Sequence, residues 1–386
     1  MPAAWKRLAL ALLLVLAPGT TWAADIRLAY LSMTIDRPPV LSNLDVWPED
    51  EGLQGARLGV ADNAATGRFL KQTFTLDEVV LPEDGDAAAA MAELASAGHR
   101  FVIADLPASA LEAAVAAAPP DMLVFNAGAP DDHLRGTACR ANLLHTLPNR
   151  AMLADALGQY LVKKRWSKWF LVIGPRPEDA AYADAIRRTA KRFGAKIVAE
   201  RTWDGDFDLR RSAATEVPQF TQGPSYDVLV VADEIGDFGE YLPYQTWDPR
   251  PVVGTQGLTP TGWHRTVEQW GATQLQNRFQ ALAGRTMTAR DYAAWAAARA
   301  VGEAATRTQA GDMAAYIQSP AFELAGFKGR ALSFRSWDGQ LRQPIGLAAA
   351  RNLVTQAPVE GFLHPINEMD TLGFDKPETA CTREGT

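Results

Sequence analysis

The residues of this 386-residue chain that could do chemistry are mostly polar side chains placed at or just beyond the ends of apolar segments. They are Asp105, Asn126, Gly128, Tyr182, Asp233 and Glu234. Two tryptophans in polar loops, Trp47 and Trp247, are aromatic candidates. Carboxylates, an amide, a phenol and glycine N–H groups suit the binding of a small molecule. A role in a turn or a helix cap is an equal alternative for each polar residue.

Signatures of the common catalytic classes are absent from the sequence. It contains no Gly-x-Ser-x-Gly, no phosphate-binding glycine loop, no His-Glu-x-x-His and no Cys-x-x-Cys. Its five histidines are scattered and lack the spacing of metal ligands. We therefore expect no enzyme, no catalytic residue and no cofactor.

The densest polar cluster is Asp131-Asp132-His133. With nearby carbonyls it could hold a hard cation. The alternative is a solvated loop that begins a helix with acidic residues, which complement the helix dipole. We favour this second interpretation, so no metal site is predicted.

The elements that must position the candidate residues are clearest between residues 168 and 203. The pattern predicts a buried strand at 169–173, a turn at 174–177, a helix at 179–193 and a second strand at 196–203. This order forms a βαβ unit with a parallel sheet. Ligands bind beyond the carboxyl ends of such strands, so residues 174–182 are a candidate site segment. The turn lacks the glycines that let a pyrophosphate approach the backbone, which argues against a nucleotide.

The same alternation continues on both sides of this unit. Predicted strands at 26–31, 74–81, 101–104 and 122–125 alternate with helices at 52–63, 86–97 and 108–118. Further strands at 226–232 and 251–253 complete a second half, and long helices follow at 267–283 and 289–310. We expect these late helices to pack on the first half, which is short of mass. The sequence thus predicts an α/β fold with two doubly wound, Rossmann-like lobes.

The N-terminal segment predicts export. Lys6-Arg7 precedes the apolar run Leu8–Ala17, and Thr21-Trp22-Ala23 offers small residues for cleavage before Ala24. The apolar run of about ten residues is too short to span a membrane. We expect a signal peptide at residues 1–23 and a periplasmic protein without direct membrane insertion.

Charge and cysteine content add two expectations. The net charge of −7 and the lack of a basic cluster argue against nucleic acid as a partner. The two cysteines, Cys139 and Cys381, stand in an oxidising compartment. They predict a disulfide that ties the C-terminal tail to the middle of the chain.

With these features the chain resembles the type I periplasmic binding proteins, the solute receptors of ABC importers, of the branched-chain amino-acid-binding kind. Three stretches are similar to a narrower family, the substrate-binding proteins associated with pyrroloquinoline-quinone (PQQ)-dependent alcohol dehydrogenase systems. They are Cys139–Pro148, Gly262–Phe279 and Val359–Phe374.

The resemblance implies two lobes joined by three hinge crossings near residues 144, 255 and 343. Lobe I would comprise residues 24–143 plus 256–342, lobe II residues 144–255 plus 343–370, and residues 371–386 would form the tail. It also implies that Tyr182 contacts the ligand. Where amino-acid receptors carry hydroxyl motifs, this chain has Asp105-Leu-Pro-Ala-Ser109 and Asn126-Ala-Gly-Ala-Pro130, which argues against an α-amino acid.

The expected function is that of a periplasmic solute-binding protein linked to PQQ-dependent alcohol oxidation. It would bind a small polar or amphipathic molecule by hinge closure and dock as a monomer on an ABC permease in the inner membrane. The alternative is a sensory module that presents its bound state to a membrane kinase or dehydrogenase. A metal chaperone built on Asp131-Asp132-His133 ranks below both.

Overall fold

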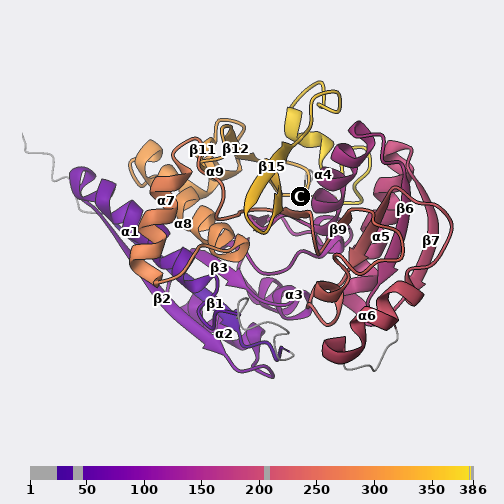
Figure 1. Ribbon diagram of the computed structural model, residues 1–386. Coiled ribbons are helices and arrows are strands. Elements are labelled where there is room, and N and C mark those ends of the chain that lie inside the picture. Colours follow the sequence, from indigo (N-terminus) through magenta and orange to yellow (C-terminus); the bar gives the residue numbers. More distant parts are fainter. Residues whose placement is uncertain (1–23, 38–46, 204–208, 382, 384–386) are drawn as a thin grey trace, which may run out of the picture.

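The structure is a computed structural model that describes residues 24–37, 47–203, 209–381 and 383. Two α/β lobes lie side by side, with the C-terminal strands between them (Figure 1). The predicted signal peptide lies outside the described residues. Across the described ranges, no helix is both long and apolar enough to cross a membrane.

Lobe I is built on a five-stranded parallel sheet in the order β2-β1-β3-β4-β5. Its strands are β1 (Ala24–Met33), β2 (Gln72–Leu81), β3 (Phe101–Asp105), β4 (Leu123–Asn126) and β5 (Leu143–His145). β3 and β4 are buried along their whole length, as expected for parallel strands covered on both faces. Helices α2 (Ala87–Ser96) and α3 (Ala108–Ala117) cover one face.

Helices from both ends of the chain cover the other face of the lobe I sheet. They are α1 (Leu53–Leu70), α7 (Ala272–Ala283) and α8 (Ala289–Thr308), and the short α9 (Met313–Gln318) packs against α8. The late helices therefore pack on the first half, as predicted. The helix predicted from residue 267 begins only at Ala272, because Trp270 and Gly271 adopt positive φ values of 55° and 80°.

Lobe II has a four-stranded parallel sheet in the order β7-β6-β8-β9. Its elements are β6 (Lys168–Ile173), β7 (Lys196–Thr202), β8 (Val228–Ala232), β9 (Val252–Gly254), α4 (Arg150–Lys163), α5 (Pro177–Phe193) and α6 (Leu209–Phe220). Helix α5 begins with Pro177, which suits the first helical position, and ends at Gly194 in the left-handed conformation (φ 75°). The predicted βαβ unit is confirmed, whereas α6 was not predicted.

Short strands join the lobes. β10 (Thr259–Thr261), β14 (Ile345–Ala349) and β15 (Asn352–Ala357) form an antiparallel sheet, and β11 (Leu324–Ala325), β12 (Ala331–Phe334) and β13 (Leu341–Arg342) form another. Leu341 lies in the lobe I core and Ile345 in the lobe II core, so the chain changes lobes between them. Three 3-10 helices are η1 (Asp132–Arg135), η2 (Gly239–Tyr241) and η3 (Glu368–Thr371). The predicted disulfide between Cys139 and Cys381 is present.

Candidate functional site

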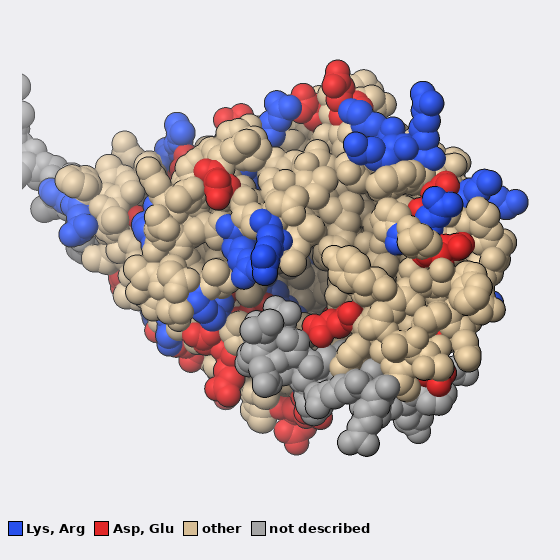
Figure 2. Space-filling view, in the orientation of Figure 1, with Lys and Arg blue, Asp and Glu red and all other residues tan. Residues whose placement is uncertain are grey.

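The carboxyl ends of strands in the two lobes meet around Arg150, the first residue of α4. Its guanidinium donates to Asp131, which follows β4 of lobe I, at 2.9 Å. It also donates to both carboxylate oxygens of Glu234, which follows β8 of lobe II, at 2.9 and 2.7 Å. The surface is hollowed between the lobes (Figure 2). This hollow is the candidate ligand cleft.

On the lobe I side, Asp105 lies in a buried polar cluster at the end of β3. Its Oδ2 accepts a hydrogen bond from the Tyr30 hydroxyl at 2.9 Å. Its Oδ1 has no hydrogen-bond partner among the described residues and lies 3.5 Å from Arg290 Nη1. Burial raises the pKa of the Asp105 carboxyl, and the Arg290 charge opposes that rise. The predicted site residue is thus at a strand end, but its own protein contacts hold it there.

Gly128 sits against this cluster and could not carry a side chain. A Cβ at this position would lie 2.4 Å from Asp105 Oδ1 and 2.7 Å from the backbone nitrogen of Leu106. The carbonyl oxygen of Gly128 accepts a hydrogen bond from Arg290 Nη2 at 2.9 Å. Gly128 therefore lets β3, the β4 turn and α8 approach one another closely.

Arg290 is the site residue that sequence reasoning missed. It lies in the first turn of α8, and its side chain remains 23 % exposed beside the buried Asp105. A guanidinium has five N–H donors, and within the described chain only the bond to Gly128 uses one. The Asp105 carboxylate raises the pKa of Arg290, so the cation is maintained. No local sequence signal marks this arginine, because only the fold brings α8 to the ends of β3 and β4.

Asn126 is at the predicted strand end, but its side chain builds a turn. Its Oδ1 accepts from the N–H groups of Gly128 and Ala129 at 3.1 and 2.8 Å. Its Nδ2 donates to the Ala129 oxygen at 2.8 Å and lies 3.0 Å from His145 Nδ1. The side chain is fully buried with its hydrogen-bonding capacity used. In this structure the Asn126 side chain thus holds the turn after β4, and its contact with a ligand stays a prediction.

Asp233 is likewise occupied by its own loop. Its Oδ1 accepts from the N–H groups of Gly236 and Asp237 at 3.0 and 2.9 Å. Its Oδ2 accepts from Phe238 and Gly239 at 3.0 and 2.6 Å. Four N–H groups surround a buried carboxylate, which therefore organises the turn after β8. The turn alternative is the correct one for this residue.

The acidic cluster after β4 serves the hinge. Asp131 pairs with Arg150, and Asp132 Oδ1 accepts the N–H of Ala151 at the start of α4 at 3.1 Å. His133 Nε2 lies 2.8 Å from Glu112. The three side chains thus have separate partners. In the described ranges, no group of three or more His, Cys, Asp and Glu side chains could hold a metal ion.

Tyr182 lies inside lobe II rather than at the surface of the cleft. Its side chain is 2 % exposed and belongs to the core cluster that contains Ile173 and Ala232. Its hydroxyl has no hydrogen-bond partner among the described residues. Burial first, and then the Glu234 charge, raise the pKa of Tyr182. The ring packs under the strand ends in this structure, and the ligand contact that the resemblance implies stays a prediction.

Trp47 lies near the Asp105 cluster. Its ring is 38 % exposed, and the Arg37 guanidinium lies 4.5 Å from the ring centre. Arg37 also pairs with Glu51 at 3.2 Å, and the Glu51 carbonyl oxygen lies 3.3 Å from the Tyr30 hydroxyl. The exposed indole is thereby linked to the lobe I strand ends.

Trp247 lies at the other end of lobe II. Its backbone N–H donates to the hydroxyl of Thr221, just after α6, at 2.8 Å. The chain from Thr221 leads into the amino end of β8, not into its carboxyl end. Trp247 therefore lies near the amino end of the lobe II sheet, because the loop after η2 returns along the sheet before β9 begins.

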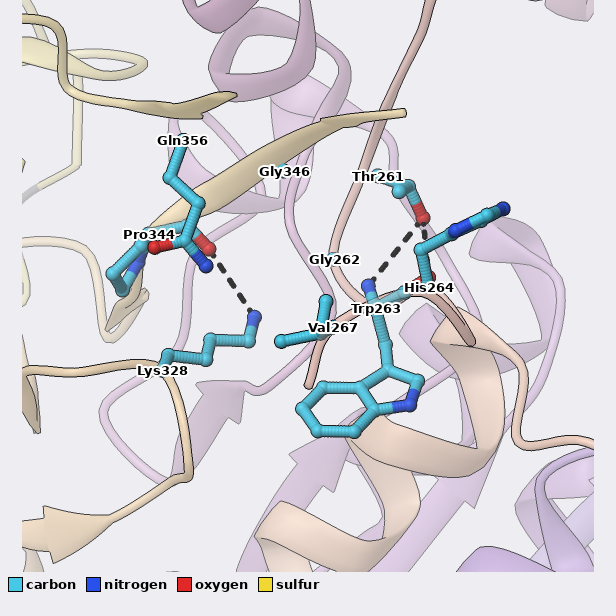
Figure 3. Close-up of a pocket in the computed structure, with 9 residues that line it drawn as sticks. All are labelled: Thr261, Gly262, Trp263, His264, Val267, Lys328, Pro344, Gly346 and Gln356. Atoms are coloured by element: carbon cyan, nitrogen blue, oxygen red, sulfur yellow. Dashed lines mark hydrogen bonds between the residues drawn. The ribbon is translucent and has the colours of Figure 1, made fainter. Parts of the chain in front are cut away.

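A small cavity lies between β10, β14 and the Lys328 side chain (Figure 3). It offers about 10 Å³ for the centre of a water molecule, which is room for one water. Lys328 Nζ donates to Gln343 Oε1 at 2.5 Å and to the Pro344 oxygen at 3.2 Å, and lies 4.3 Å from the centre of the Tyr292 ring. Burial lowers the pKa of Lys328 well below its ordinary value. The cavity is too small for an organic solute.

Comparison with known proteins identifies the fold. The model of a family described as periplasmic binding proteins matches residues 50–208. The structure superposes on a branched-chain amino-acid ABC transporter ligand-binding protein from Burkholderia xenovorans with a TM-score of 0.68 and 16 % identity, over 93 % of this chain and 99 % of that one. The chain has the fold of the type I periplasmic binding proteins.

Other solved structures of this fold are named for different ligands. One is a leucine-, isoleucine-, valine-, threonine- and alanine-binding protein from Brucella ovis in a closed conformation (TM-score 0.67, 15 % identity, 90 % of this chain and 98 % of that one). Another is an R. palustris solute-binding protein in complex with benzoate (TM-score 0.63, 12 % identity, 93 % and 100 %). No curated protein matches the sequence significantly. At these identities the likeness establishes the fold alone.

Proposed function

We propose that the chain is the solute-binding subunit of an ABC importer. A small polar or amphipathic solute binds between the lobes, the lobes close, and the closed form docks as a monomer on an inner-membrane permease. The observation that carries this proposal is that residues after β4 of lobe I and β8 of lobe II meet at Arg150. Export to the periplasm by residues 1–23 is part of the same proposal.

The ligand contacts we propose differ from those predicted. Arg290 would donate to a carboxylate or hydroxyl oxygen of the ligand, since most of its donors have no partner among the described residues and Asp105 keeps it charged. Glu234 would face it from lobe II, and the exposed ring of Trp47 would cover apolar parts. Asp105 and Gly128 position Arg290. Tyr182 remains a proposed contact through its unpartnered hydroxyl.

The class of solute follows from what occupies the strand ends. The carboxylate of Asp105 and the amide of Asn126 stand where amino-acid receptors present hydroxyl donors, and both hold protein groups here. We therefore propose an alcohol or an organic acid rather than an α-amino acid. The similarity to binding proteins of PQQ-dependent alcohol dehydrogenase systems supports this choice, and no catalytic role is proposed.

Calorimetric titration of the mature protein tests this function. The panel contains short-chain alcohols, their aldehydes and acids, benzoate and branched-chain amino acids. At least one alcohol or acid should bind, and Arg290→Ala should weaken it by about 10- to 100-fold, the value of a charge-assisted hydrogen bond of about 1.5–3 kcal/mol. Arg68→Ala, at the exposed end of α1, is the matched control and should bind like the wild type. A panel without any binder would count against solute transport, and binding restricted to amino acids would overturn the proposed class.

A further inference from the structure

We propose that the C-terminal segment from Glu368 to Cys381, together with Arg383, is a fourth connection between the lobes that limits how far they rotate against each other. We call it the C-terminal strap. The resemblance implies three hinge crossings, and the strap would add to them. Its contacts alternate between the two lobes along the chain.

One part of the strap is fixed to lobe II. Leu372 belongs to the lobe II core. The N–H of Gly373 donates to Asp155 Oδ2 at 2.9 Å, and the Gly373 carbonyl accepts from Arg188 and Arg192 at 2.8 and 2.7 Å. Asp155 is fully buried in α4 and binds the same two arginines at 3.0 and 2.7 Å. This clamp between α4 and α5 holds the backbone of the strap through charge-assisted hydrogen bonds.

Residues further along the strap are fixed to lobe I. The hydroxyl of Thr379 donates to the Arg135 carbonyl at 2.9 Å. Cys381 forms the disulfide with Cys139, and Arg383 donates to the Ala141 carbonyl at 3.0 and 2.6 Å. The three partners lie between β4 and β5, which both belong to the lobe I sheet. The lobe I end of the strap is therefore covalent.

A second lobe I attachment lies before the clamp. Asp370 accepts from Arg335 and Arg342 at 2.9 and 2.7 Å. Arg342 belongs to β13, beside Leu341 of the lobe I core, and Arg335 directly follows β12, which pairs with β13. Arg335 is buried and also donates to the carbonyls of Met369 and Leu372. The strap thus passes from lobe I to lobe II and back within a few residues.

The strap returns from lobe II to lobe I between two adjacent residues. Glu378 pairs with Arg188 of lobe II at 3.0 Å, and its neighbour Thr379 bonds to lobe I. Adjacent Cα atoms lie about 3.8 Å apart, so a rotation that separates Arg188 from Arg135 must break one attachment once the Arg188 and Glu378 side chains are fully extended. The disulfide closes a loop of sequence separation 242 that contains the whole lobe II sheet. The lobe II sheet is consequently part of a covalent ring that the disulfide closes on lobe I.

A limited hinge has a consequence for ligand binding. A receptor that visits fewer open arrangements loses less conformational entropy when it closes on a ligand. The strap should therefore favour affinity by narrowing the ligand-free ensemble. It should also keep the relative orientation of the two lobes within the range that a partner can recognise.

The test measures the distance distribution between the lobes in the ligand-free full mature chain. Spin labels on unnatural amino acids at Thr66 of α1 and Lys191 of α5, both exposed, report the distance by pulsed electron resonance. Two variants release the strap. Cys139→Ser/Cys381→Ser removes the covalent anchor, and a six-residue Gly/Ser insertion between Glu378 and Thr379 keeps every anchor but adds about 13 Å of reach. The same insertion between Glu83 and Asp84, in an exposed lobe I turn, is the control.

Both strap variants should widen the distribution by several ångströms on the scale of that added reach, and the control should leave it unchanged. Should the double cysteine variant not fold, the insertion variant alone decides, because it retains the disulfide. A lower melting temperature with an unchanged distribution in the insertion variant overturns the proposal, since the disulfide then only stabilises its surroundings. The readout needs no ligand, so its outcome is independent of the proposed transport function.

Discussion

The carboxylates near the candidate cleft differ in how well the fold stabilises their charged form. Asp179 is fully buried in the first turn of α5. Its two oxygens accept the N–H groups of Glu234 and Arg176 at 2.8 and 3.2 Å. Burial nevertheless raises the pKa of Asp179 to about 6, and the nearby Asp233 and Glu234 charges add to that rise. Two backbone donors do not compensate for the lost hydration.

This raised pKa predicts a pH-dependent contribution to stability. In the unfolded chain an aspartate has a pKa of about 3.9, so between about pH 4 and pH 6 the folded state binds a proton that the unfolded chain releases. Stability from Asp179 is therefore present at low pH and is lost as the pH rises through this window. Asp179→Asn cannot ionise, so its free energy of unfolding should gain up to about 3 kcal/mol relative to the wild type from pH 4 to pH 7. Urea titrations at several pH values measure this, and a difference independent of pH would contradict it.

The same residue types explain why the site was only partly predictable. Asp and Asn at strand ends line binding sites, and they also accept the N–H groups of turns. The sequence places Asp233 and Glu234 side by side, yet Asp233 binds four N–H groups while Glu234 faces Arg150. Nothing local distinguishes them, because the difference depends on a helix that begins at residue 150. Arg290 was missed for the same reason.

At the scale of elements, the contact between α1 and α8 depends on glycine. A Cβ at Gly55 would lie 1.9 Å from the Asp291 carbonyl oxygen, and one at Gly59 would lie 2.6 Å from the Ala298 Cβ. Gly302 on α8 faces Asn63 in the same way, at 1.9 Å. The two helices therefore approach closely, and α8 carries Arg290 to the strand ends. The arginine's position rests on this packing.

Gly59→Ala sets two effects against each other. Alanine favours a helix interior over glycine by about 1 kcal/mol, whereas overpacking a close contact costs about 1–3 kcal/mol. We expect the clash to dominate and the free energy of unfolding to fall by about 1–2 kcal/mol. Ala65→Gly, on the exposed face of α1, calibrates helix propensity and should cost about 1 kcal/mol. Stabilisation by Gly59→Ala in urea titrations would show that the helices have room to separate.

The elements were predictable where one signal was strong. Buried parallel strands such as β3 and β8 are continuous apolar runs, and Pro177 and Gly194 mark the start and end of α5. Helix α6 was not predicted because it contains Pro218, a residue that normally interrupts a helix. The start of α7 was misplaced because the positive φ of Trp270 cannot be read from an apolar run. Short pairings such as β10 with β14 depend on contacts between distant segments, which a local pattern does not encode.

At the scale of the whole molecule, Arg150 joins the two lobes through two carboxylates. Asp131 belongs to lobe I, and Glu234 belongs to lobe II. The arginine side chain is 4 % exposed, so its charge is compensated almost entirely by these partners. Burial raises the pKa of Glu234, and the Asp131 and Glu178 charges add to the rise, while Arg150 opposes it. Without this arginine, the negative charges of the carboxylates at the hinge would therefore repel one another without compensation.

Arg150→Met should make that excess visible as a pH-dependent loss of stability. At neutral pH the variant leaves the poorly hydrated Glu234 carboxylate, and the Asp131 carboxylate beside it, without their cation, which should cost about 3–5 kcal/mol of the free energy of unfolding. Without Arg150 the pKa of Glu234 rises further above its unfolded value, so the stability linked to its proton is present at low pH and lost as the pH rises. The deficit should hence shrink as the pH falls from about 7 to about 5. Asp131→Asn keeps the bidentate pair with Glu234 and should cost less than about 1 kcal/mol, because Asp131 is 27 % exposed. Urea titrations of both variants measure this. A deficit in Arg150→Met that stays constant with pH would mean that the variant is destabilised by lost packing and not by unpaired charge.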